Sequence, residues 1–359
     1  MFPRWLCGSQ PSWPVIGWFK SPRETKMRAP DLLQLFESLV LPMPATSGSE
    51  LSATKIPGLP TYRLAKDAGG SPCLLIEQLS AGSQAPIRLE NLQVSFGVPC
   101  TITEPEGKKE QDRFTIVRCS SADRTLFPHF LKIVSPIVAG LGSSPTTAAV
   151  RRAIFGLVEL FQALAAPAKK TVQGIWAELL LIRLSTDPRA MAAAWHYDPT
   201  ERFDFSAGPQ RIEVKSSTNR QREHYFALEQ LVASGGAKIV VASVFTERVG
   251  GGVSLKRLFD DTRSLLAADP QLTIRFDSVF YNSLGSGWAD VMDESFDWEL
   301  GKDSLAFFDA ELVPKIGGGI PPTVSDVRFR SDLSSLATME GTALLELGGL
   351  LAAARRAEA

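Results

Sequence analysis

The stretch KIVVASVF, residues 238–245, is almost entirely apolar over its whole length. A short run without polar alternation is typical of a strand buried on both faces, and such strands occur in sheets that helices cover. Helical and strand-like patterns alternate around it: a helix, a hairpin-like pair of strands, a second helix and then this buried strand. That order predicts an α/β core, a mixed sheet flanked by helices.

Apolar residues at helical spacing predict further elements along the chain. We expect helices at residues 31–41, 147–166, 174–185, 222–233 and 254–269, with a final helix in the last ten residues. Short segments separated by turn residues predict strands between residues 62 and 119. Loops are expected at 42–58 and 186–200, and strands or strand ends at 296–309 and 325–336.

These patterns predict several domains, as the length of 359 residues also indicates. We expect a tail of uncertain status (1–30), an N-terminal β-rich domain (31–145), the α/β core (146–275), and C-terminal strands and a helix packing on that core (276–359). Two interpretations of the tail are equal alternatives: a hydrophobic docking segment, or translation that begins at Met27 instead of Met1.

Composition excludes several classes of protein. A formal net charge of −1 argues against a protein that coats nucleic acid by bulk charge, so any such contact must be local. The four cysteines form no CxxC pair and only three histidines are present, which disfavours a zinc site. No apolar run is long enough to span a membrane, so we expect a cytoplasmic protein with reduced thiols.

The stretch RFDFSAGPQRIEVKSS, residues 202–217, contains candidate metal-binding and catalytic residues. Strand alternation places Glu213 and Lys215 on one face, and the turn-like SAGPQ would bring Asp204 beside Glu213 on an adjacent strand. Two close carboxylates repel unless a cation lies between them, and oxygen ligands of this kind suit Mg²⁺ or Mn²⁺. A nearby lysine can orient a metal-bound water or stabilise charge on a phosphate.

A third carboxylate, Glu178, lies in the apolar helix GIWAELLLIRL and would need a partner if buried. The E-x-K spacing alone is weak evidence, because it also occurs at 24–26 and 106–108 in polar, loop-like surroundings. Taken alone, the Glu213–Lys215 pair is best interpreted as an ordinary ion pair on a solvated strand. Asp204 and Glu178 together favour an active site that cleaves phosphodiesters.

Other charged residues are weaker candidates. Arg220 and Arg222 follow the strand and could contact a phosphate backbone, although a solvated loop is the better interpretation for each. Arg328 and Arg330 are two residues apart and share one face of a predicted strand, which fits a cleft or an ordinary exposed surface equally well. His196 is interpreted as a structural loop histidine rather than a catalytic base.

A helix Glu, then an Asp, then E-x-K resembles the pattern of the PD-(D/E)XK nuclease superfamily. The stretches GIWAELLLIRL, AWHYDPTERFDFSAGPQRIEVKSSTNRQREHYFALEQL and VPKIGGGIPPTVSDVRFRSDLS more closely resemble a bacterial PD-(D/E)XK family of unknown function. Its members are found in phage-defence gene clusters, beside helicase-like Z1 proteins and abortive-infection proteins. The resemblance covers residues 31–335 and is strongest over 174–231.

The resemblance implies a restriction-endonuclease-like core and a role for individual residues. Asp204 and Glu213 would be metal ligands, with the Val214 carbonyl as a third. Lys215 would be the catalytic lysine and Glu178 the helix carboxylate. Gln230 matches a position where some relatives carry a functional glutamine. Asp204 follows a phenylalanine instead of the proline of the motif, which lowers the specificity of the match.

The sequence therefore predicts a Mg²⁺- or Mn²⁺-dependent DNA endonuclease or exonuclease of a bacterial anti-phage system, with DNA and other defence-operon proteins as partners and no membrane. Two alternatives remain. One is a catalytically inactive scaffold or DNA-binding subunit that keeps the nuclease fold, and the other is a module that recognises modified DNA.

Overall fold

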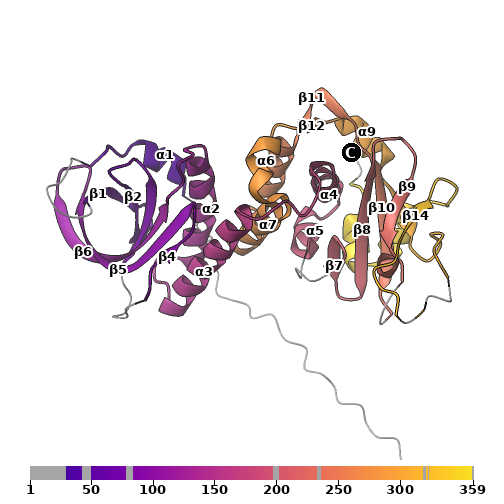
Figure 1. The fold of residues 1–359 in the computed structure, drawn as a ribbon, viewed down its shortest axis with the longest axis horizontal. Helices are drawn as coiled ribbons and strands as arrows, with labels where there is room; N and C mark the ends of the chain where they lie inside the picture. The colour runs from indigo at the N-terminus through magenta and orange to yellow at the C-terminus, as the bar shows by residue number, and fades with distance from the viewer. Residues whose placement is uncertain are drawn as a thin grey trace, which may run out of the picture.

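The computed structural model describes residues 30–42, 50–77, 84–196, 202–232, 236–317, 321 and 323–357. Residues 1–29, which make up nearly all of the predicted tail, lie outside this part of the chain. Figure 1 shows three parts from left to right: a small β-barrel, a group of long helices, and a mixed sheet flanked by helices. The fold is therefore mixed α/β with a β-rich N-terminal part, and the boundaries expected for the domains stay predictions.

The barrel forms because six strands pair in the order β1-β2-β3-β6-β5-β4, and a parallel pairing of β1 with β5 closes it. The strands are β1 (Glu50–Ile56), β2 (Leu59–Lys66), β3 (Pro72–Glu77), β4 (Ile87–Arg88), β5 (Leu92–Thr103) and β6 (Lys109–Cys119). Alternate residues such as Leu75 and Phe114 form an apolar interior. Strand β1 lies within 42–58, so the loop expected there is wrong for residues 50–56.

A group of helices connects the barrel to the sheet. It comprises α1 (Leu32–Glu37), α2 (Leu126–Leu141), α3 (Thr147–Leu164), α6 (Leu255–Leu266) and α7 (Pro270–Leu284). The apolar stripe predicted for residues 147–166 is confirmed, because its six members are all buried: Val150, Ile154, Leu157, Val158, Phe161 and Leu164. One continuous core runs from the outer face of the barrel through these helices to the sheet.

The four-stranded sheet has the order β13-β10-β8-β7, formed by Ala306–Asp309, Lys238–Phe245, Gln210–Ser217 and Phe205–Ala207. Strands β8 and β10 are parallel, whereas the other neighbours are antiparallel. The β10 strand is the KIVVASVF run, and six of its eight residues are buried, as its pattern predicts.

Different elements pack against the two faces of the sheet. Ile212, Val240 and Ala242 face the helical core, which includes α4 (Val172–Leu184), α5 (Pro188–Ala194) and α11 (Gly349–Ala354). Val241 and Ile239 face a separate cluster beneath the two-stranded ribbon of β9 (Glu223–Ala227) and β14 (Arg328–Asp332). Glu213 and Lys215 alternate with Ile212, so they lie on the ribbon side.

The helix expected at 222–233 is wrong. Residues 223–227 form strand β9, followed by a short 3₁₀ turn, η1 (Leu228–Gln230). The stretch EHYFA alternates exposed and buried side chains with period two, and its aromatic residues suit a pleated surface. Strand β9 and the η1 turn, rather than a helix, thus lie between the parallel strands β8 and β10 in the chain.

Other elements also differ from expectation. Helix α5 begins within the predicted loop 186–200, because Asp187 caps its N-terminus and Pro188 occupies its first turn. Helices α2 and α7 were not predicted, and α2 contains Pro136. The remaining elements are β11 (Arg248–Ser254), α8 (Trp288–Val291), β12 (Ser295–Phe296), α9 (Trp298–Ser304), α10 (Gly341–Leu347) and η2 (Gly285–Gly287).

Among the described residues, none of the helices has the length and apolar character needed to cross a membrane.

Candidate metal centre

The hairpin of β7 and β8 brings two carboxylates together. Phe205 pairs with Ile212, so Asp204, one residue earlier, lies across from Glu213 in the antiparallel register. The backbone N–H of Val214 donates to Asp204 Oδ2 at 2.7 Å, which fixes the aspartate against the second strand. Both carboxylates are buried. The juxtaposition predicted from the short turn is present.

Glu178 approaches this hairpin from the middle of α4. Apolar residues surround it on its helix, and the side chain is only 3% exposed. Its Oε2 atom accepts a hydrogen bond from the indole Nε1 of Trp195 at 2.7 Å, and its Oε1 atom lies 2.6 Å from the Nζ of Lys170. The buried carboxylate thus has the cationic partner that its position requires.

Lys170 is a site residue that sequence reasoning missed. It precedes α4 on the loop after α3, and its ammonium group forms ion pairs with both Glu178 and Asp204. Burial disfavours its charged form, but these two carboxylates raise its pKa above the ordinary lysine value. The only signal in the sequence was that a buried Glu178 needs a cation nearby.

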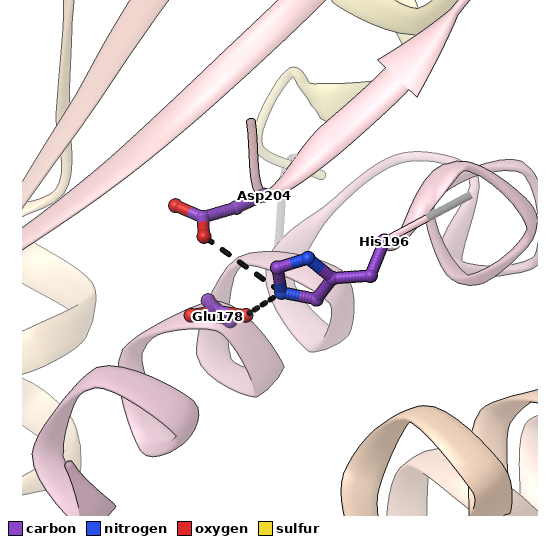
Figure 2. Close-up of side chains that lie close together, drawn as sticks. All are labelled: Glu178, His196 and Asp204. Atoms are coloured by element: carbon purple, nitrogen blue, oxygen red, sulfur yellow. Dashed lines mark hydrogen bonds and ion pairs between the residues drawn. The ribbon is translucent and has the colours of Figure 1, made fainter. Parts of the chain in front are cut away.

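His196 also reaches the centre. Trp195 forms an isolated antiparallel β-bridge with Phe205, and the backbone N–H of His196 donates to the Asp204 carbonyl at 2.8 Å. The segment that follows α5 therefore lies against the β7–β8 hairpin. Figure 2 shows the imidazole pointing toward both carboxylates; Nε2 lies 3.1 Å from Glu178 Oε2 and 3.8 Å from Asp204 Oδ1. The interpretation of His196 as a purely structural loop residue therefore omits its position beside the site.

Glu178, His196 and Asp204 form a group that could hold a metal ion. Each offers one ligand atom, and the three atoms lie within 4.8 Å of one another. Carboxylate oxygens suit Mg²⁺ and Mn²⁺, whereas an imidazole nitrogen favours Mn²⁺ and later transition metals over Mg²⁺. The donor set therefore fits a divalent cation and leaves its identity open.

Glu213, Lys215 and Gln230 form a second cluster on the other side of Asp204. Lys215 Nζ lies 2.7 Å from Glu213 Oε1, and the Gln230 amide donates to the same oxygen at 2.6 Å. Gln230 Oε1 in turn accepts from Lys215 Nζ at 3.2 Å and from the Ala227 N–H at 3.0 Å. The glutamine predicted to be functional thus contacts both members of the E-x-K pair, from a 3₁₀ turn.

The protonation of these carboxylates follows from burial and mutual repulsion. Burial and the neighbouring Asp204 raise the pKa of Glu213 to about 8, while Lys215 opposes the shift. Burial and Glu178 also raise the pKa of Asp204. Burial acts in the same direction on Glu178, but the charges and hydrogen bonds of Lys170 and His196 together outweigh it and lower the pKa of Glu178. Glu213 Oε2 is buried without a hydrogen-bond partner. An orphaned oxygen beside Asp204 is compatible with a cation there, as predicted for this carboxylate pair.

The four arginines considered as phosphate contacts occupy different surroundings. Arg222 is fixed to the fold, because it donates to Ser243 and to the Ser304 carbonyl. Arg220 forms an exposed ion pair with Glu247 at 2.6 Å. Arg328 and Arg330 share the exposed face of β14, as their spacing predicts.

Comparison with family models gives a match described as "Putative PD-(D/E)XK family member, (DUF4420)", which covers residues 35–334. The chain belongs to this PD-(D/E)XK family. Neither the curated proteins nor the solved structures gave a match. Glu178, Asp204, Glu213 and Lys215, which the PD-(D/E)XK pattern singles out, all lie around the β7–β8 hairpin, and the individual roles assigned to them stay predictions.

Proposed function

We propose that this PD-(D/E)XK protein is a metal-dependent nuclease that cleaves the phosphodiester bonds of DNA. One observation carries the proposal: Glu178, Asp204, Glu213 and Lys215 converge around one hairpin in a member of this family. The pattern combines ligands for a hard cation with a lysine placed to contact a phosphate.

Each side chain of the site has a separate role in this proposed reaction. Asp204, with Glu178 and His196 on one side and Glu213 on the other, would hold a Mg²⁺ or Mn²⁺ ion, and the Val214 carbonyl is a further candidate ligand. Such an ion supplies Lewis-acid polarisation of phosphate and lowers the pKa of bound water. Lys215 donates toward the phosphate or the attacking water, and Gln230 fixes the position of its ammonium group.

The ribbon of β9 and β14 supports DNA as the substrate. Arg328 and Arg330 lie on its exposed face, and Tyr225, directly opposite Arg330, is 70% exposed. Arginines contact phosphates, and an exposed aromatic ring can stack on a base. Strand β9 leads directly into the turn that carries Gln230. A DNA strand bound on this ribbon would therefore lie close to the proposed site.

The biological setting in the proposal is bacterial anti-phage defence, in the cytoplasm and together with other proteins of the same operon. Its support is the resemblance of residues 31–335 to a bacterial family whose members are found in phage-defence gene clusters. A second candidate is a nuclease-fold scaffold or DNA-binding subunit without turnover. The observation that favours this second candidate is Lys170, which forms ion pairs with both Glu178 and Asp204 without any metal.

A cleavage assay separates the two candidates. Purified protein is incubated with linear, circular and single-stranded DNA and with RNA, each with Mg²⁺ or Mn²⁺, alone and with its operon partners. The nuclease proposal predicts metal-dependent cleavage that Glu213→Gln and Lys215→Met abolish, while Glu346→Gln, an exposed helix substitution, leaves it intact. Absence of cleavage under every condition, with phage protection retained by the two site variants, would establish the scaffold.

A further inference from the structure

Lys170 occupies the space between two carboxylates that the proposed function assigns to a metal ion. Its Nζ lies 2.6 Å from Glu178 Oε1 and also forms a hydrogen bond with Asp204 Oδ1. These are two of the three residues whose ligand atoms cluster tightly enough to hold a cation. The other lysine of the site, Lys215, pairs instead with Glu213 and Gln230. The two ammonium groups therefore serve different carboxylates.

The backbone holds Lys170 in place. The N–H groups of Lys169 and Lys170 both donate to the Ser283 carbonyl at the end of α7, at 3.0 and 3.1 Å. Next to this contact, Gly285 has a φ of +58°, and a Cβ there would meet the Ala166 carbonyl oxygen at 2.3 Å. Only glycine allows so close an approach, so the loop is clamped against α7.

We propose that Lys170 is a positioning residue that holds Glu178 and Asp204 together in the metal-free protein, and that its ammonium group must withdraw before a divalent cation can lie between them. The inference deepens the proposed function and rests on it, since it assigns a regulator to the same metal site. Without a cation, two buried carboxylates this close would repel each other strongly.

Lys170 has room to withdraw. Its side chain is 26% exposed, whereas the carboxylates that it contacts are almost completely buried. A lysine side chain is long and flexible, so its head group can reach water while its backbone stays clamped. After withdrawal, Glu178 and Asp204 keep the Trp195 and Val214 hydrogen bonds that orient them.

Binding of Mn²⁺ alone, measured by isothermal titration calorimetry on the full chain, tests this proposal. Lys170→Met removes the competing ammonium group and should bind Mn²⁺ about tenfold more tightly or better than the wild type. Lys169→Met is the matched control, because Lys169 is exposed and its backbone makes the same contact; its affinity should equal that of the wild type. Asp204→Asn should abolish binding in every background.

Thermal denaturation in EDTA provides a second readout. Lys170→Met leaves two buried carboxylates uncompensated, so its Tm should fall by about 5 °C or more, and Mn²⁺ should restore it. If this variant fails to fold, Lys170→Arg, which keeps a cation with a bulkier head, should bind Mn²⁺ no more tightly than the wild type.

An affinity of Lys170→Met for Mn²⁺ that is equal to or weaker than that of the wild type overturns the proposal, as does an absence of binding in both. These outcomes are independent of turnover. If the wild type cleaves DNA but Lys170→Met has an unchanged affinity for Mn²⁺, the role proposed for Lys170 is wrong and the nuclease function is retained. Tighter Mn²⁺ binding by Lys170→Met, without cleavage of any nucleic acid, would support the role of Lys170 and contradict the nuclease function.

Discussion

Replacing Glu213 by glutamine separates the effect of this side chain on stability from its effect on catalysis. Glu213 is 3% exposed, and its Oε2 atom has no hydrogen-bond partner. Burial, and after it the charge of Asp204, raise its pKa to about 8. At neutral pH the metal-free side chain is therefore mostly protonated and neutral, as glutamine is.

The direction of the pH effect follows from this shift. An acid with a higher pKa in the folded chain binds its proton more tightly when folded, so stability is greatest below the unfolded pKa and falls as pH rises toward the folded one. A shift from 4.5 to about 8 corresponds to at most about 5 kcal/mol at high pH. Because glutamine does not titrate, the Glu213→Gln variant should gain stability relative to the wild type by several kcal/mol between about pH 5 and pH 8.

Urea denaturation in EDTA at a series of pH values measures this difference. Glu346→Gln, an exposed helix substitution, is the control and should show no pH-dependent gap. The same Glu213→Gln protein should lose metal-dependent DNA cleavage despite its stability. A stability difference between Glu213→Gln and the wild type that stays constant across this pH range would refute the argument that Glu213 is buried beside a second carboxylate.

Three further substitutions probe the surroundings of the carboxylates. Trp195→Phe removes the indole donor to Glu178 and should lower the free energy of unfolding by about 2 kcal/mol, measured by urea denaturation; no loss would mean that the bond is immaterial. His196→Ala removes the imidazole, so calorimetry should show a larger loss of affinity for Mn²⁺ than for Mg²⁺, and equal losses would exclude His196 as a ligand. Gln230→Ala frees Lys215 from its acceptor and should reduce kcat with a folded chain and an altered pH profile of cleavage, whereas an unchanged profile would make Gln230 purely structural.

The hairpin part of the site could be predicted because it is local. Asp204 and Glu213 are separated by a short turn, and any hairpin with this register places them opposite each other. Glu178 could be predicted as well, since a carboxylate within an otherwise apolar helix must find a partner in the core. In both cases the periodicity of one or two adjacent elements carries the information.

Lys170 and His196 could not be predicted, because tertiary contacts place them. Lys170 reaches the site through a loop held by Ser283, more than a hundred residues away along the chain. His196 adopts a φ of +41°, which no residue pattern signals for a histidine. Strand β9 was missed for the same reason: its partner β14, which was predicted as a strand, lies about a hundred residues further along the chain.

Anomalous diffraction from crystals soaked in Mn²⁺ tests the central claim most directly. The account predicts Mn²⁺ bound to the Asp204 carboxylate at about 2.2 Å, with further ligands from Glu178, His196 or Glu213. It also predicts that the Lys170 ammonium group has left the space between Glu178 and Asp204. A crystal saturated with Mn²⁺ that shows no ion at Asp204, with Lys170 still paired to both carboxylates, would contradict the metal-dependent nuclease proposed for this chain.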